Sequence, residues 1–248
     1  MSYQGLSRPL VSYFLSQLYR PTVLEIGVDK GQTAIPLIHN LVLDNIPFKY
    51  EGVDIMIQDS VMQCLSNMRG VKLSNIDDNP NVNIIFGNSL SILPQLIDGN
   101  FKYDLILLDG DHNYYTVSRE LEMIKHLCHT TTIIICDDYN GRWSHQDLYY
   151  CDKDEYKDVK ISTHKQNTKK KGVKPAIDDF IDNEKGKWSL IDMVKDNGSP
   201  GEFCILHKKE FIDIHFSNEQ KYMFQTKLNL IVNENHSHRF INSPMATT

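Results

Sequence analysis

Apolar residues gather along this chain in short blocks that alternate with longer amphipathic stretches. Most of the short blocks are rich in β-branched or other apolar residues and several end in an acid, a pattern typical of buried parallel strands. The longer stretches place apolar residues three or four positions apart, as one face of a helix requires. The pattern predicts strands at residues 23–26, 48–54, 81–86, 103–109 and 131–138, and helices at residues 6–19, 33–43, 58–68, 90–96 and 114–128.

Strand and helix alternate up to residue 138, which favours a parallel sheet covered by helices on both faces. A helix at 175–183 and two strands at 188–193 and 202–207 follow. The Asn-Gly-Ser-Pro-Gly segment at 197–201 predicts a tight turn between these two strands. The predicted fold class is therefore α/β, with a mostly parallel sheet that ends in a C-terminal antiparallel hairpin.

The periodicity fades between residues 139 and 172, in a segment rich in aspartate, tyrosine and lysine. Long irregular segments in compact domains often serve as lids or binding loops. We interpret residues 1–210 as one domain, with 139–172 as a lid or substrate-binding insertion. Residues 211–248 are interpreted as a C-terminal arm or tail through which a homo-oligomer could form.

Composition narrows the class of protein. The 248 residues carry a net charge of −6, which offers no electrostatic case for binding nucleic acid or an anionic membrane. No run approaches the roughly 18 apolar residues of a membrane span, and the first residues lack the pattern of a signal peptide. The five cysteines form no CxxC pair, which favours reduced thiols. We expect a cytoplasmic protein.

The first predicted strand runs into a turn of the form Glu25-x-Gly27-x-x-x-Gly31. Glycines allow the backbone to turn sharply and to approach a nucleotide-like ligand closely. The dinucleotide pattern G-x-G-x-x-G is not met, and a plain strand–helix turn is the alternative. Asp54, at the end of the second strand, can accept both hydroxyls of an adenosine ribose. Its alternative role is a cap on the strand end.

Two further segments carry a family resemblance: Asp109-Gly-Asp111-His112-Asn-Tyr and Asp137-Asp138-Tyr139. Together with the glycine turn and the order of elements, over roughly residues 20–208, they resemble the class I methyltransferases that use S-adenosylmethionine. The two segments are similar to those of the metal-assisted O-methyltransferase branch, which includes macrocin and antibiotic-sugar enzymes. The resemblance implies a Rossmann-like seven-stranded methyltransferase fold.

The resemblance also implies roles at the cofactor site. Glu25 would help to hold the amino-acid end of S-adenosylmethionine, beside the turn of Gly27 and Gly31. Asn88 and Ser89 stand where the family often has Gly-Asp-Ser and would contact the adenine. Asp109 would border the cofactor as well as a metal ion.

Three carboxylates, Asp109, Asp137 and Asp138, follow two neighbouring predicted strands. Such a group repels itself unless a positive charge lies between its members. Mg²⁺ prefers oxygen ligands, and it can lower the pKa of a substrate hydroxyl and orient it. Alternatively, Asp137 and Asp138 cap the next element or pair with Arg142 or with the lysines at 169–171.

Proton removal is predicted for Asp111 or His112. The resemblance favours the acid, whereas an imidazole titrates in the range that suits a base at neutral pH. Hydrogen bonding at a helix N-terminus is the alternative role of His112. Aromatic residues of the insertion offer stacking surfaces for an acceptor, namely Tyr139, Trp143, Tyr149, Tyr150 and Tyr156.

The predicted function is transfer of a methyl group from S-adenosylmethionine to a hydroxyl of a small molecule, sugar-like or phenol-like, with Mg²⁺ assisting. Two alternatives are a metal-free N- or C-methyltransferase and a catalytically silent S-adenosylmethionine-binding interaction module. A nicotinamide-dependent oxidoreductase is a weaker third.

Overall fold

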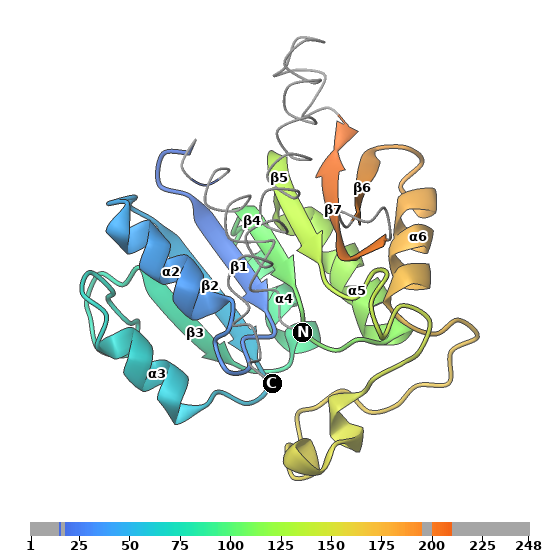
Figure 1. Ribbon diagram of the computed structural model, residues 1–248, viewed down its shortest axis with the longest axis horizontal. Coiled ribbons are helices and arrows are strands. Elements are labelled where there is room, and N and C mark those ends of the chain that lie inside the picture. Colours follow the sequence, from blue (N-terminus) through green and yellow to red (C-terminus); the bar gives the residue numbers. More distant parts are fainter. Residues whose placement is uncertain (1–14, 16–17, 195–199, 210–248) are drawn as a thin grey trace, which may run out of the picture.

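A computed structural model describes residue 15, residues 18–194 and residues 200–209, and contains one seven-stranded sheet. The strands are β1 (Thr22–Ile26), β2 (Lys49–Asp54), β3 (Val82–Phe86), β4 (Tyr103–Leu108), β5 (Cys128–Cys136), β6 (Trp188–Val194) and β7 (Pro200–Lys208). Their order in the sheet is β3-β2-β1-β4-β5-β7-β6 (Figure 1). β7 runs antiparallel to β5 and β6, and the other pairs are parallel. The predicted fold class is confirmed.

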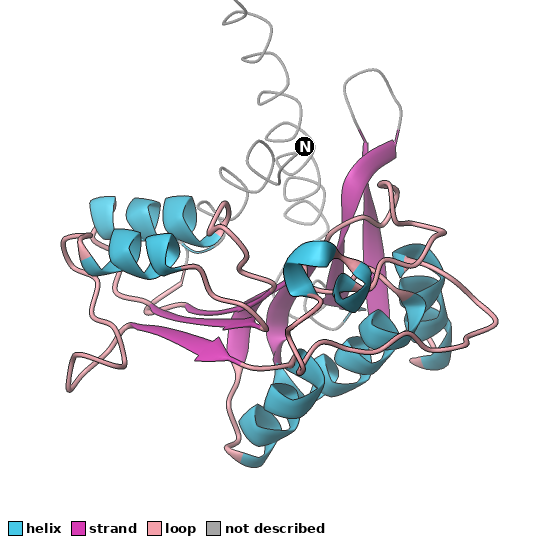
Figure 2. Ribbon diagram, turned by 90° about the horizontal axis from the view of Figure 1, so that it is seen from below, coloured by secondary structure: helices cyan, strands magenta, loops and turns pink. Residues whose placement is uncertain are grey.

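Helices cover both faces of this sheet (Figure 2). They are α2 (Ala34–Leu43), α3 (Asp59–Ser66), α4 (Ser89–Asp98), α5 (Tyr114–Ile124) and α6 (Val173–Asn183). Successive strand residues point to opposite faces. Val23 therefore packs in the cluster that contains α2 and α3, and Leu24 in the cluster with α4, α5 and α6. Within the described ranges, no helix has the length and apolarity needed to cross a membrane.

Some element boundaries differ from those predicted. β5 begins at Cys128 and ends at Cys136, so Asp137 and Asp138 lie just beyond it. The N–H of Asp137 still donates to the carbonyl of Leu108, but the positive φ of Asp138 (56°) turns the chain out of the sheet. α5 ends at Ile124, and a short 3-10 turn follows it. Of the predicted helix at 6–19, the structure describes only residues 15, 18 and 19. The predicted tail at 211–248 lies outside the described residues.

The strand order reverses direction between β1 and β4, because β2 and β3 extend to one side and β5 to the other. Ligands of such sheets bind beyond the carboxyl ends of the strands at this point. Here the N–H of Asp109 donates to the carbonyl of Ile26, and that of Gly27 to the carbonyl of Val53. The predicted site residues at the ends of β1, β2 and β4 are thus brought to one edge.

Candidate functional site

A pocket opens at this edge, between the ends of the central strands and the insertion. Its walls combine apolar, polar and acidic side chains. They comprise Ile26, Gly27, Asp29, Val53, Asp54, Ile55, Gly87, Asn88, Ser89, Asp109, Gly110, Asp111, Glu120, Tyr150, Tyr156 and Thr163. Six predicted site residues line it, namely Gly27, Asp54, Asn88, Ser89, Asp109 and Asp111. A mixed lining of this kind suits a ligand with both a flat apolar part and polar groups.

The glycine turn is required by its geometry. Gly27 has a φ of 88° and Gly31 a φ of 69°, a conformation that side chains disfavour. A Cβ on Gly27 would lie 2.0 Å from the carbonyl oxygen of Asp109. The turn is therefore pressed against the end of β4, and a residue with a side chain does not fit there.

Asp54 supports this turn directly. Its Oδ2 accepts hydrogen bonds from the backbone N–H groups of Val28 (2.7 Å) and Asp29 (2.8 Å), and its Oδ1 accepts from Met56 (2.8 Å). Burial raises the pKa of Asp54, while these three hydrogen bonds act against that shift. The arrangement fits the strand-end cap, and Asp54 also lines the pocket. Its contact with a ribose stays a prediction.

Glu25 lies beneath the turn rather than in the pocket wall. Its side chain is buried, with the residue 1% exposed, and the hydroxyl of Tyr50 donates a 2.6 Å hydrogen bond to its Oε2. Burial raises the pKa of Glu25 to about 8, and the neighbouring Asp54 adds to the shift. A contact between Glu25 and the cofactor stays a prediction.

Asn88 connects the pocket to the insertion. Its Oδ1 accepts from the N–H of Leu90 (2.8 Å), which caps α4. Its Nδ2 donates to the carbonyl of Ile161 (2.7 Å) and to Oγ1 of Thr163 (3.0 Å). The amide that was predicted to contact adenine is therefore engaged in holding two parts of the fold together.

Glu120 lines the pocket but was not predicted as a site residue. Oγ of Ser89 donates a 2.5 Å hydrogen bond to its Oε1. Burial raises the pKa of Glu120 to about 8. The sequence does carry a signal for it, since Glu120 falls between Val117 and Leu121 on the apolar face of α5, where an acid is unusual.

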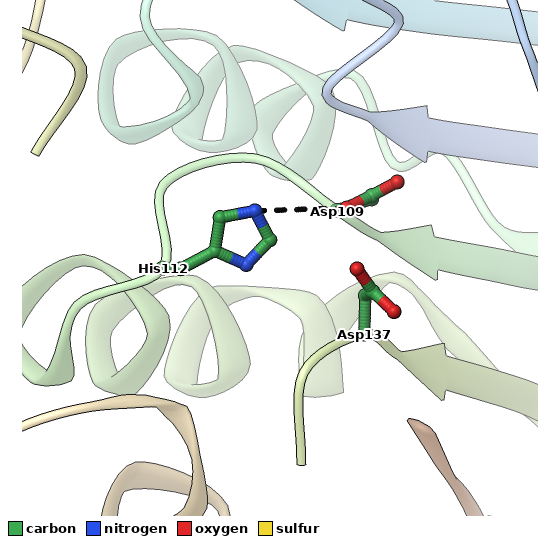
Figure 3. A group of neighbouring side chains, drawn as sticks. All are labelled: Asp109, His112 and Asp137. Carbon is green, nitrogen blue, oxygen red and sulfur yellow. Dashed lines mark ion pairs between the residues drawn. The ribbon is translucent and has the colours of Figure 1, made fainter. Parts of the chain in front are cut away.

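A second cluster adjoins the pocket at the ends of β4 and β5. Ligand atoms of Asp109, His112 and Asp137 all lie within 4.8 Å of one another (Figure 3). Nε2 of His112 is 3.7 Å from Oδ1 of Asp109. Burial raises the pKa of both aspartates, and the neighbouring Asp137 raises that of Asp109 further. The two carboxylates repel each other when both are ionised. A divalent cation between them would relieve this repulsion, and their oxygens are ligands that such a cation prefers.

Asp138, also predicted as a metal ligand, lies beside the other nitrogen of the imidazole, and its contact with a metal stays a prediction. Its Oδ2 lies 3.4 Å from Nδ1 of His112. Burial raises the pKa of Asp138 to about 6, while hydrogen bonds from the backbone N–H groups of Trp143 and Arg142 oppose the shift. These bonds fit the capping alternative. The lysine alternative is not supported, because Lys170 pairs with Asp179 and Lys171 with Asp147.

The two candidate bases differ in their freedom to react. The carboxylate of Asp111 accepts from the N–H of Tyr150 (3.2 Å) and from the hydroxyl of Thr116 (3.3 Å). His112 is buried, and burial lowers its pKa to about 4, so its imidazole is neutral near pH 7. A neutral imidazole has one nitrogen that can accept a proton. Burial thus makes His112 a weaker base than a free imidazole, and Asp111 is engaged in holding the insertion, so the choice between the two bases stays a prediction.

The insertion runs beyond the carboxyl ends of the strands (Figure 1). It contains two 3-10 turns, Tyr150–Asp152 and Asp154–Tyr156. The rings of Tyr150 and Tyr156 pack edge to face, 4.8 Å apart, and both line the pocket. Of the five aromatic residues predicted to offer a stacking surface, these two line the pocket, whereas Tyr139 and Tyr149 are buried and Trp143 does not line it.

Asp147 holds the insertion in place. Its Oδ1 accepts from the N–H groups of Tyr114 (3.0 Å) and Gly172 (2.8 Å), and its Oδ2 pairs with Nζ of Lys171 (3.1 Å). The side chain is 7% exposed. One buried acid thus joins the start of α5 to the C-terminal end of the insertion.

Comparison with known proteins agrees with this geometry. Residues 24–139 match a family model described as a methyltransferase domain. A search of curated proteins finds no match. The S-adenosylhomocysteine-bound methyltransferase PaMTH1 of Podospora anserina superposes with a TM-score of 0.53 at 16% identity. That comparison covers 84% of this chain and 80% of PaMTH1, and it shows a shared fold.

Two other structures are similar at lower scores. A putative rRNA methylase of Clostridium thermocellum has a TM-score of 0.49 and 13% identity over 84% of this chain and 97% of its own. MycE, from the mycinamycin biosynthetic pathway and in complex with Mg and S-adenosylhomocysteine, has a TM-score of 0.48 and 14% identity over 84% of this chain and 51% of its own. The family model spans the chain from β1 to just beyond β5, and the similarity to PaMTH1 shows that the two proteins share a fold.

Proposed function

We propose that this chain is an S-adenosylmethionine-dependent O-methyltransferase that acts on a hydroxyl of a small molecule with the help of a divalent cation. One observation carries the proposal: Asp109 lines the pocket and also belongs to the cluster with His112 and Asp137. A methyl donor in the pocket and a hydroxyl at the cluster would meet at this residue. This shared wall is the reason for preferring metal-assisted transfer to a metal-free reaction.

The cation would be held by Asp109 and Asp137, with His112 or Asp138 as a further ligand. Two carboxylates suit Mg²⁺ or Mn²⁺, and an imidazole ligand would shift the preference toward Mn²⁺ or another transition metal. When bound, the cation would supply Lewis-acid chemistry that makes an acceptor hydroxyl more acidic.

The chain's own residues would orient the reactants and move the proton. If Asp138 rather than His112 completes the ligand set, an imidazole with its hydrogen on Nδ1 would leave Nε2 able to accept the proton of the acceptor hydroxyl; if His112 binds the cation, Asp111 would accept that proton. The oxygen then forms a bond to the methyl carbon as the carbon–sulfur bond breaks. The products are a methyl ether and S-adenosylhomocysteine. Tyr150 and Tyr156 would cover the pocket and exclude water from it.

The test is a transfer assay with radiolabelled S-adenosylmethionine and a panel of phenols, sugars and amines, with and without EDTA. We expect label on hydroxyl compounds only, lost in EDTA and restored by Mg²⁺ or Mn²⁺. Labelled amines in EDTA would establish the metal-free N-methyltransferase instead. S-adenosylhomocysteine binding without transfer to any compound would favour the interaction module. Tight NADH binding without binding of the methyl donor would favour the oxidoreductase.

A further inference from the structure

Glu120 is a buried acid of which the fold uses only one oxygen. The residue is 1% exposed, and Oε1 accepts the hydrogen bond from Ser89. Oε2 is buried and has no hydrogen-bond partner among the described residues. Buried polar atoms are nearly always paired, so the unpaired oxygen of a residue that lines the pocket indicates a missing partner.

The lining of the pocket indicates which part of a ligand Glu120 meets. Val53 and Ile55 supply apolar walls to the same pocket. A flat, neutral base needs such walls and a few polar contacts, whereas a charged amino-acid group does not. The side-chain amide of Asn88, which lines the same pocket, is already hydrogen-bonded to Leu90, Ile161 and Thr163. Oε2 of Glu120 is therefore an uncommitted polar atom beside Asn88 and Ser89.

We propose that Glu120 is a specificity residue for the adenine of the methyl donor, with Oε2 forming a hydrogen bond to a ring nitrogen of the base. The proposal rests on the proposed function, since it requires S-adenosylmethionine in this pocket. The protonation state agrees with it, because burial raises the pKa of Glu120 to about 8. Near neutral pH the carboxyl is mostly protonated and can donate to a ring nitrogen, which only accepts.

The test combines variants of the full chain with analogues of S-adenosylhomocysteine in which one ring nitrogen is replaced by carbon: 1-deaza, 3-deaza and 7-deaza. Dissociation constants are measured by calorimetry for the wild type, Glu120→Gln and Glu120→Leu. Glu120→Gln keeps a neutral donor, whereas Glu120→Leu removes it at similar volume. Glu122→Gln, on the exposed side of the same helix, is the matched control.

We expect the wild type and the Glu122→Gln control to bind one deaza analogue about tenfold more weakly than the parent compound, as loss of one buried hydrogen bond predicts. Glu120→Leu should bind the parent about tenfold more weakly and no longer distinguish that analogue. Glu120→Gln should retain the discrimination.

Two results would overturn the inference separately from the proposed function. If the wild type binds the parent and all three analogues equally, no ring nitrogen is recognised; this measurement needs no variant to fold. If Glu120→Leu binds the parent compound and still binds that deaza analogue more weakly, a group other than Glu120 recognises the adenine. A wild type that binds no S-adenosylhomocysteine at all would instead remove the proposed function itself.

Discussion

The backbone of Gly27 lies so close to that of Asp109 that a Cβ on the glycine would be 2.0 Å from the aspartate's carbonyl oxygen. The turn after β1 and the acid after β4 are therefore fixed relative to each other by main-chain contact. Gly27 belongs to the pocket wall, and Asp109 belongs to both the wall and the acidic cluster. The main-chain contact between them therefore fixes the backbone of the wall relative to the backbone of the cluster.

Gly27→Ala should destabilise the protein strongly. The substitution adds a clash with backbone to an unfavourable φ of 88°, and we expect a loss of roughly 2–4 kcal/mol in the free energy of unfolding. Denaturant unfolding measures it. Gly70→Ala is a matched control, because its φ is 83° but its nearest neighbour, Val42, is 3.4 Å away. Equal losses in the two variants would show that the contact with Asp109 contributes nothing.

Asp137→Asn should remove the thermal stabilisation by metal. A cation that binds only the folded protein stabilises it, and raises its melting temperature, with the logarithm of one plus the ratio of cation concentration to dissociation constant. We expect Mg²⁺ or Mn²⁺ to raise the melting temperature of the wild type and not that of the variant. Asp152→Asn, an exposed substitution in the insertion, should respond as the wild type does. A variant with the full metal-dependent rise would contradict the proposed ligand.

Glu25→Gln should change how stability depends on pH. The pKa of Glu25 is raised from 4.5 to about 8 in the folded protein. Between these values the folded state holds a proton that the unfolded chain has released, so the contribution of Glu25 to stability is fully present below pH 4.5 and is lost as the pH rises to 8. The slope is at most about 1.4 kcal/mol per pH unit.

In Glu25→Gln this contribution should vanish, and the unfolding free energy should decline less between pH 5 and pH 8 than in the wild type, by the limit above of about 1.4 kcal/mol per unit. Glu120→Gln provides a comparison, because the pKa of Glu120 is raised to a similar value. Superimposable pH profiles of the wild type and Glu25→Gln would show that Glu25 is ionised in the folded protein.

Asp147→Ala should loosen the insertion. Two backbone N–H groups and Lys171 lose their buried acceptor, which we expect to cost about 2–4 kcal/mol. Limited trypsin digestion should then cut faster at Lys160 and Lys165. Lys170→Ala removes only a surface pair with Asp179 and should digest like the wild type. Unchanged digestion of Asp147→Ala would mean that other contacts hold the insertion.

The fold was predictable because its signals are local. The runs 105–108 and 133–136 are continuously apolar, and Gly27 marks a turn that needs a positive φ. The relative positions of side chains on different elements were harder to predict from the sequence. The sequence grouped Asp138 with Asp109 and Asp137, but a positive φ at Asp138 turns its carboxylate to the other side of His112.

The roles of Asn88 and Glu120 depended on contacts that are distant in sequence. Asn88 holds Ile161, which is 73 residues away, and Ser89 reaches Glu120 across 31 residues. Neither distance can be read from a local pattern. The one local signal for Glu120 was an acid on the apolar face of a helix.

The hydrogen bonds from Asn88 to Ile161 and Thr163 make one wall of the pocket depend on the insertion. A donor molecule that stabilises this wall also stabilises the insertion, and by linkage an acceptor held by the insertion tightens the donor by the same factor. Under the proposed function, the donor and the acceptor should therefore bind cooperatively, each raising the affinity for the other by the same factor.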